Sequence, residues 1–180
     1  MKISFFNKAI RIMLFTNGLV LISSAMIAPI YAIFVEKVGG DLMDASIAGG
    51  IFALVAGLVT IFSSKLSDEI KENELILVLG YALIGFGFFL YLFVSSVLFL
   101  FIVQAIIGLG EAIYTPAFDA IYSKHLNKKE IGLEWGAWES LNYFTKTIGA
   151  IAGGIIVTFF GFKTLFIIMA ALCFGSAFYI

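Results

Sequence analysis

Six apolar runs, each long enough to cross a lipid bilayer, constrain this chain more than any other feature. A membrane-spanning helix needs about 17 to 25 mostly apolar residues, because the hydrocarbon core of a bilayer is ~30 Å thick. The chain is 62% hydrophobic and only 13% charged, so it lacks the polar surface of a soluble domain. The sequence therefore predicts an all-α integral membrane protein. Its expected spans are roughly 12–34, 45–64, 75–95, 97–122, 135–160 and 164–180.

The first span has an alternative interpretation as a signal peptide, because basic residues precede it and small residues occur near Ser24 and Ala25. Its apolar stretch continues to Phe34, which favours a retained helix. No low-complexity tract or linker separates the spans, so residues 1–180 are expected to form one six-helix domain. The last span stops at Ile180 without a polar flank, as expected if the chain were cut there.

Basic residues are distributed unequally between the two sets of loops. One set, with the N-terminus, carries Lys2, Lys8, Arg11, Lys65, Lys71, Lys124, Lys128 and Lys129. The other set carries Lys37 and Lys163, and Lys146 lies inside the fifth span. Because cytoplasmic loops are rich in Lys and Arg, the N-terminus is expected in the cytoplasm. An even number of spans places the C-terminus there too, in a multi-pass protein of the cell (inner) membrane.

Several classes of function are not indicated. A net charge of −1 gives no sign of nucleic-acid binding, and the single cysteine, Cys173, cannot form an internal disulfide. The only histidine, His125, lies in a basic loop without a cluster of metal ligands. The sequence also lacks Asn-Pro-Ala and TVGYG motifs of known pores. We therefore expect neither an enzyme nor a protein with a metal or cofactor.

The fourth span contains a carboxylate, Glu111, in the middle of its apolar run. An ionisable residue at that depth is costly and usually marks a binding site, a transport pathway or a proton relay. Glu111 belongs to a series of polar or small residues at helical spacing: Gln104, Gly108, Glu111, Thr115 and Asp119. One face of this helix is therefore expected to meet water or a partner.

Two other spans carry polar residues on one face. The first span has Asn17, Ser24 and Tyr31, and the fifth has Glu139, Asn142, Lys146, Gly149 and Gly153. Spans one, four and five are thus expected to line a polar cavity, whereas spans three and six, which carry few polar residues, are expected to be outermost. The second span carries small residues at Ser46, Gly49, Ala53, Gly57, Thr60 and Ser64, which would let another helix approach closely.

Glu111 and Lys146 are expected at matched depth, each about 16 Å from the cytoplasmic end of its helix at ~1.5 Å per residue. They could form an ion pair, or each could bind part of a substrate. The alternative is that they only neutralise one another inside a bundle. The cost of charge in a membrane favours a functional role. Asp119 and Glu139 lie nearer the rim, where a gate or loop anchor is as reasonable as a substrate contact.

Three segments carry a family resemblance. The loop Ser64-Lys65-Leu66-Ser67-Asp68-Glu69-Ile70-Lys71-Glu72 is similar to G-x-x-x-D-[RK]-x-G-[RK], with Asp68 at the acidic position. The fourth span has Gly108 and Pro116-Ala117, with Gln104 and Ile107 where a related motif has arginine and glutamine. The fifth span has Gly149-Ala150-Ile151-Ala152-Gly153-Gly154, which is similar to the end of G-x-x-x-G-P-x-x-G-G with alanine for proline, and Gly161-Phe162-Lys163 follows as a turn.

With its topology, the chain resembles the N-terminal six-helix half of a major facilitator superfamily transporter. The resemblance implies two three-helix inverted repeats and secondary transport of a small solute by alternating access, with protons as the candidate coupling ion. From the polar faces of spans one, four and five, the residues expected to bind solute or protons are Glu111, Lys146, Asn142, Gln104, Asn17 and Tyr31. Gating or loop-motif residues would be Asp68, Lys65, Asp119 and Glu139, and helix-packing residues Gly49, Gly57, Gly149, Gly153 and Gly154.

Two alternatives stay open for the working unit. Identical copies could pair as a two-fold homodimer around Glu111 and Lys146, with span two of one copy against span five of the other. The competing possibility is that the chain is half of a larger transporter with a missing C-terminal half. A truncated remnant or a membrane scaffold that transports nothing is the alternative function.

Overall fold

The computed structural model describes residues 7–70 and 72–180, and it contains helices and no strand in that part of the chain. Five helical segments are long and apolar enough to cross a membrane, which agrees with the predicted all-α membrane protein. Lys2 and Lys71, which contributed to the expected orientation, lie outside the described residues. The helices are α1 (Lys8–Ile27), η1 (Ala28–Ile30), α2 (Tyr31–Lys37), α3 (Leu42–Glu69), α4 (Asn73–Leu90), η2 (Tyr91–Phe93), α5 (Val97–His125) and α6 (Ile131–Tyr179).

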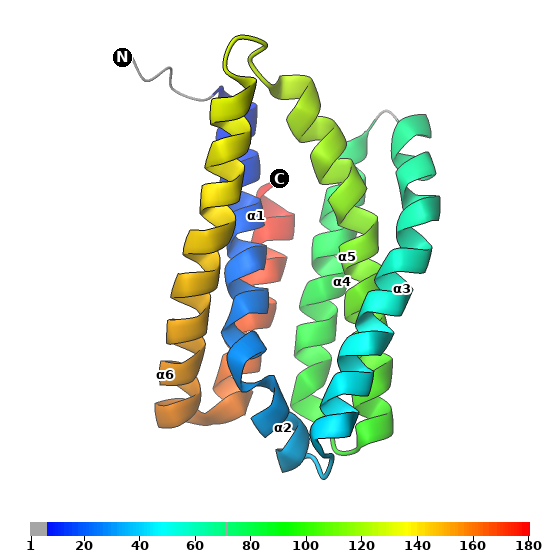
Figure 1. Ribbon diagram of the computed structural model, residues 1–180, viewed down its shortest axis with the longest axis vertical. Coiled ribbons are helices and arrows are strands. Elements are labelled where there is room, and N and C mark those ends of the chain that lie inside the picture. The colour runs from blue at the N-terminus through cyan, green and yellow to red at the C-terminus, as the bar shows by residue number, and fades with distance from the viewer. Residues whose placement is uncertain (1–6, 71) are drawn as a thin grey trace.

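The first expected span is broken into α1, the single-turn η1 and the short α2 (Figure 1). The side chain of Asn7 caps the start of α1 by accepting a hydrogen bond of 2.9 Å from the amide of Ile10. Pro29 has no N–H to donate, so it interrupts the α-helical hydrogen bonds where the chain turns through η1. This break places α2 at the opposite end of the bundle from the N-terminus (Figure 1).

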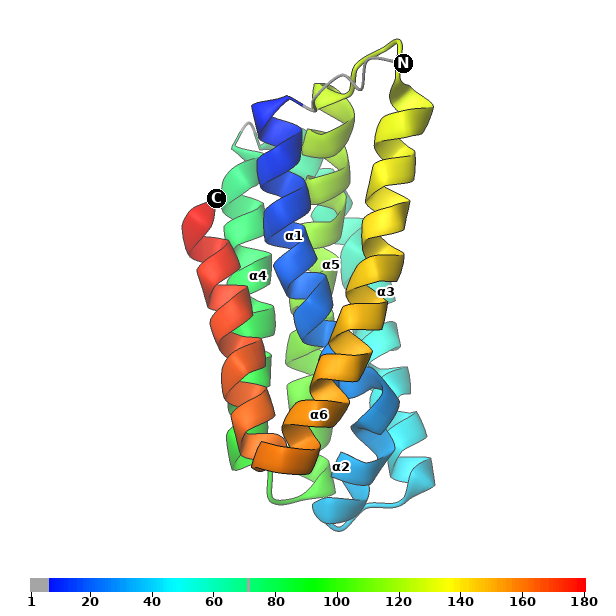
Figure 2. The same cartoon turned by 90° about the vertical axis from the view of Figure 1, so that its left-hand side faces the viewer.

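The longest helix, α6, contains a sharp reversal at Gly161. Its backbone there has φ 79° and ψ 172°, a conformation that glycine adopts far more easily than other residues. Figures 1 and 2 show the chain descending to this point and returning beside α1 and α4. The two arms, residues 131–160 and 162–179, occupy the positions of the expected fifth and sixth spans. We call the end of the bundle that holds this reversal and α2 the far end.

The helices pack in two groups that share a central contact. α1 packs along α6, whereas α5 packs between α3 and α4, and α4 also contacts α6 (Figures 1 and 2). Glycines allow the closest approaches. A Cβ on Gly80 of α4 would lie 2.9 Å from the carbonyl oxygen of Gly110 in α5, and one on Gly153 of α6 would collide with the carbonyl of Met26 in α1.

Within the chain, span three is packed more than expected for a helix that was predicted to be outermost and to face lipid. Half of the apolar window of α4 is buried, compared with 6% for α3. The physical reason is that α4 carries glycines on two faces. Gly80 meets α5, and a Cβ on Gly85 would lie 3.0 Å from the Cβ of Cys173 in α6. The sequence analysis identified contact surfaces by their polar residues, and glycines are not polar. It therefore predicted that α4 faces lipid.

Candidate functional site

A cavity of about 390 Å³ lies between α1, α3 and α5, and Glu111 is part of its wall. Most of the wall is apolar, and α4 contributes Phe88 to it. Its polar side chains are Ser24 of α1, Tyr31 at the start of α2, Tyr91 of η2, and Gln104 and Glu111 of α5. The structure therefore brings together three of the expected binding residues, Tyr31, Gln104 and Glu111.

Gln104 connects two tyrosines from different elements. Its amide nitrogen donates hydrogen bonds of 2.6 Å to the Tyr31 hydroxyl and 3.1 Å to the Tyr91 hydroxyl. Each hydroxyl accepts a hydrogen bond from Gln104, and the Tyr31 hydroxyl keeps its own proton to donate elsewhere. Tyr31 is only partly buried and lines the cavity, so it is available as a donor to a bound solute.

Tyr91 was missed by the sequence analysis. It stands in the third span, where we expected no functional residue, and its ring is 3% exposed. A buried tyrosine usually finds a partner for its hydroxyl, which is the one signal that could have identified it.

Glu111 lies midway along α5 and has one side-chain partner. The Tyr114 hydroxyl donates a hydrogen bond of 3.2 Å to its carboxylate, one turn further along the same helix. Among the residues that the structure describes, the only ion pair joins Lys65 and Glu69 at 4.0 Å, so no lysine or arginine neutralises Glu111. A carboxylate in an apolar cavity without a cation is a group suited to taking up a proton or binding a cationic solute.

The suggested Glu111–Lys146 ion pair is therefore not formed. Lys146 is exposed, and its ammonium lies 5.8 Å from the centre of the Tyr143 ring. It lines a neighbouring cavity of about 550 Å³, which shares Leu21, Ser24 and Ala28 with the cavity of Glu111. The two cavities thus adjoin along α1 and η1, with Glu111 in one and Lys146 in the other. Equal depth along two helices did not predict this, because depth says nothing about the direction in which each side chain points.

Two asparagines that were expected in the site do not line either cavity. Asn17 is completely buried inside the bundle, and neither atom of its amide bonds to another described residue. Asn142 is partly buried, and its amide is 3.5 Å from the carbonyl of Trp138 in its own helix.

The expected gating residues are at the end of the bundle where α1 begins. Asp68, Asp119 and Glu139 are exposed there, and Lys65 forms the surface pair with Glu69. Glu134, which the sequence analysis did not single out, is 4% exposed and accepts a hydrogen bond of 2.7 Å from the amide of Asn127. It therefore holds the loop between α5 and α6. A carboxylate in the first turn of a helix was the available signal.

The five glycines expected to pack helices fall into two sets. Gly149 and Gly153 are buried against α1 of the same chain. Gly49, Gly57 and Gly154 have open space where a Cβ would be. Gly153 is therefore occupied by α1 within its own chain.

Comparisons with known proteins agree with this architecture. The family model of the Major Facilitator Superfamily matches residues 13–180. An uncharacterized MFS-type transporter of Methanocaldococcus jannaschii is 28% identical over 87% of this chain and 40% of its own length. The proton-coupled antiporter flippase LtaA of Staphylococcus aureus is 30% identical over 90% of this chain and 43% of its own length. The chain thus spans about two fifths of the length of these relatives.

Proposed function

The chain belongs to the major facilitator superfamily, and from this premise we propose that it forms a six-helix unit of a secondary transporter, with the Glu111 cavity as its solute site. The unit would move a small solute across the cell membrane by alternating access. The observation that carries this proposal is one unpaired carboxylate in a mostly apolar cavity, next to hydroxyl and amide groups. The cavity volume of about 390 Å³ lies within the usual range for small-molecule sites.

The pairing of helices supports a six-span unit with an internal inverted repeat. If the arms of α6 are counted as spans five and six, exchanging the first three spans with the last three preserves the contacts. α1 then packs on the arms of α6 as α5 packs on α3 and α4, and the α4–α6 contact maps onto itself. Both corresponding pairs have a glycine at the contact, on the first arm of α6 in one pair and on α5 in the other: Gly153 of α6 meets α1, and Gly108 of α5 meets the backbone of Phe52 in α3. Repeats of this kind are a property of the family.

We also propose that Glu111 couples transport to protons. The carboxylate has only the Tyr114 hydroxyl as a side-chain partner, so binding a proton breaks no ion pair. The relative from Staphylococcus aureus is named as a proton-coupled antiporter flippase, and we propose proton coupling for this chain too. Lys146, in the neighbouring cavity, would contact the solute or influence Glu111 through the shared wall. The mostly apolar lining suits an amphipathic solute, so lipid-linked compounds are a second class to test.

Reconstituted protein tests this function. The full chain is placed in liposomes with a pH-sensitive dye inside, and proton movement is recorded as compounds from a panel of small and lipid-linked solutes are added. With the wild-type chain, we expect at least one solute to cause proton movement. With Glu111→Gln, the rate of proton movement for that solute should be at least about tenfold lower, since the glutamine amide does not take up a proton at the pH values at which a carboxylate does. Glu74→Gln is the matched control, because Glu74 is exposed outside the cavity.

Two results would contradict the proposal. Unchanged proton movement in Glu111→Gln across the pH range would remove the role of the carboxylate. No flux with any compound, from folded and correctly inserted protein, would favour the alternative of a scaffold or an inactive remnant.

A further inference from the structure

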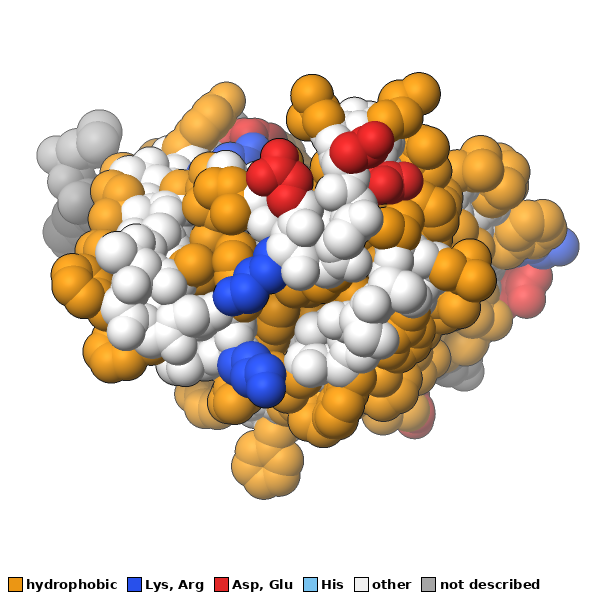
Figure 3. Space-filling view, turned by 90° about the horizontal axis from the view of Figure 1, so that it is seen from below, with side chains coloured by type: hydrophobic (Ala, Val, Ile, Leu, Met, Phe, Trp, Pro, Cys, Tyr) orange, Lys and Arg blue, Asp and Glu red, His pale blue; other side chains and the backbone are white. Residues whose placement is uncertain are grey.

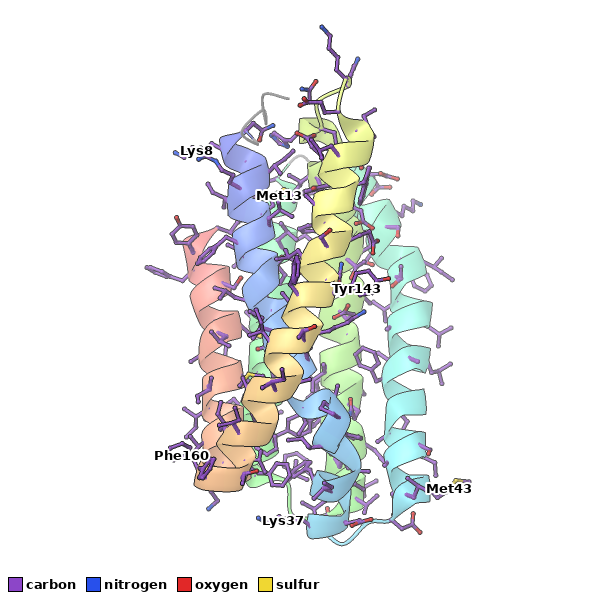
Figure 4. All side chains as sticks on the ribbon, turned by 60° about the vertical axis from the view of Figure 1, so that its left-hand side comes forward. Lys8, Met13, Lys37, Met43, Tyr143 and Phe160 are labelled. Carbon is purple, nitrogen blue, oxygen red and sulfur yellow. The ribbon has the colours of Figure 1, made fainter. Side chains whose placement is uncertain are left out.

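A third cavity lies at the far end of the bundle, away from Glu111. It has a volume of about 410 Å³ and lies between the end of α2, the segment after η2, and the reversal of α6 at Gly161. Figure 3 looks onto this end and shows basic side chains close together beside exposed apolar surface, with acidic side chains on the same face. Figure 4 places Lys37 and Phe160 at the same end.

Two lysines line this cavity, and no carboxylate does. They are Lys37 in the last turn of α2 and Lys163, two residues after the reversal of α6. Neither forms an ion pair within the described part of the chain. Nearby, Asp41 and Asp44 are engaged with each other's backbone amides at the start of α3, through hydrogen bonds of 3.0 and 2.9 Å. In the described part of the chain, neither ammonium lies within ion-pair distance of a carboxylate, including the exposed Glu36 that precedes Lys37.

Ordinary helix electrostatics explains only one of these lysines. A cation in the last turn of a helix is favourable, which fits Lys37 in α2. Lys163 is in the first turn after the reversal, where the helix dipole disfavours a cation and favours an anion. An anion bound next to Lys163 would offset this unfavourable position, and Lys37 lines the same cavity.

The cavity has an aromatic floor. The ammonium of Lys37 lies 5.4 Å from the centre of the Phe162 ring, so the side chain leans over this floor. The Phe34 ring packs on Phe162 and Phe166 with centroids 5.3 and 4.8 Å apart, and Tyr91 packs on Phe166 at 4.9 Å. A charged rim over a rigid apolar floor matches a ligand with an anionic head and apolar chains.

We infer that this cavity binds a phosphate group, carried by an anionic lipid headgroup or by a free phosphate compound. The two lysines supply the charge-assisted hydrogen bonds that a phosphate needs, and the aromatic floor receives the adjoining apolar part. Basic pockets between membrane helices on the cytoplasmic side are known lipid-headgroup sites, and this cavity, at the end opposite the N-terminus, would take its ligand from the other side of the membrane. The site is independent of the proposed transport role of Glu111, and Tyr91 forms part of the wall of both cavities.

Native mass spectrometry of the full chain released from detergent tests the inference. Dioleoyl phosphatidylglycerol is the probe, and dioleoylglycerol is its partner with the same chains and no phosphate. We expect the wild-type chain to retain phosphatidylglycerol and not dioleoylglycerol. The double variant Lys37→Gln with Lys163→Gln should bind phosphatidylglycerol about 30-fold more weakly, because each basic residue near an anionic lipid contributes about fivefold.

The matched control is Lys124→Gln with Lys128→Gln, which removes the same charge from exposed residues at the other end of the bundle and should keep the lipid. Excess inorganic phosphate distinguishes the two sources. If phosphate displaces bound phosphatidylglycerol at a concentration similar to that of the lipid, the ligand is a free phosphate compound. If phosphatidylglycerol stays bound in excess phosphate, the ligand is the lipid. Equal retention by both double variants would overturn the inference. If the Lys37→Gln, Lys163→Gln variant does not fold, the variant Lys37→Arg with Lys163→Arg, which keeps both charges, should still retain phosphatidylglycerol. The inference would also be overturned if the wild-type chain retained dioleoylglycerol as well as it retains phosphatidylglycerol.

Discussion

Asn17 illustrates how a single buried side chain can oppose stability. It is completely buried, and neither its amide oxygen nor its amide nitrogen bonds to a described residue. A buried polar group without a partner costs about 1–3 kcal/mol. We expect Asn17→Leu, which has a similar shape, to raise the free energy of unfolding by about that amount.

Thermal unfolding in detergent micelles measures this change. Ser23→Ala is the control, because the buried Ser23 hydroxyl donates a hydrogen bond of 3.0 Å to the Met169 carbonyl and its loss should destabilise the protein. If Asn17→Leu lowers the melting temperature, Asn17 has a stabilising partner after all. A variant that is more stable and transports less would show that Asn17 serves function at the expense of stability.

The residues of the site could be predicted from the sequence only in part. Glu111 and Gln104, seven residues apart on α5, both reach the cavity, as does Tyr31. Their polarity inside apolar runs was the signal. Tyr91 and Tyr114, which complete the hydrogen bonds, gave no such signal, because a tyrosine in an apolar span looks like packing. Which cavity Lys146 faces depends on helix rotation, and a spacing argument does not fix it.

At the scale of the helices, glycines allow the closest contacts between neighbouring helices. Gly153 and Gly154 are neighbours in α6, but only Gly153 faces another helix, where a Cβ would collide with the Met26 carbonyl of α1. We expect Gly153→Ala to lower the free energy of unfolding by about 1–3 kcal/mol, since the helices must move apart. Gly154→Ala adds the same methyl group in open space and should be close to neutral.

Unfolding of the two variants in mixed micelles checks this pair. Equal stability of Gly153→Ala and the wild type would mean that the α1–α6 contact is looser than the structure shows.

The positions of the helices were largely predictable, and their neighbours were not. Apolar runs and charged loops set the spans, because each run must cover the thickness of a bilayer. The break at Pro29 changed the first span into α1, η1 and α2, which followed from a residue that lacks a donor. The burial of α4 was not foreseen, because its contacts depend on Gly80 and Gly85, and small residues also occur on the exposed face of α3.

At the scale of the whole molecule, α3 is the helix that most needs a partner. Only 6% of its apolar window is buried, and Gly49 and Gly57 have open space beside them. Small residues in a membrane helix allow close approach of another helix. The two halves of a full transporter of this family are related by an axis along the membrane normal. A two-fold homodimer has the same symmetry, so we propose that α3 of one copy faces the first arm of α6 of another.

Disulfide crosslinking between differently tagged copies in native membranes tests this assembly. One copy carries Gly57→Cys on α3, the other carries Ile151→Cys on the exposed face of α6, and both carry Cys173→Ala. We expect a crosslinked dimer on oxidation, because α3 packs on α5 and α6 on α1 within each chain, which leaves these two faces for each other. In the control, the first copy carries Leu79→Cys, on an exposed part of α4, instead of Gly57→Cys, and the second copy still carries Ile151→Cys. This pair should give no crosslink. A chain that stays monomeric in lipid, with no crosslink from Gly57→Cys, would contradict the homodimer and favour a separate C-terminal half as the partner of α3.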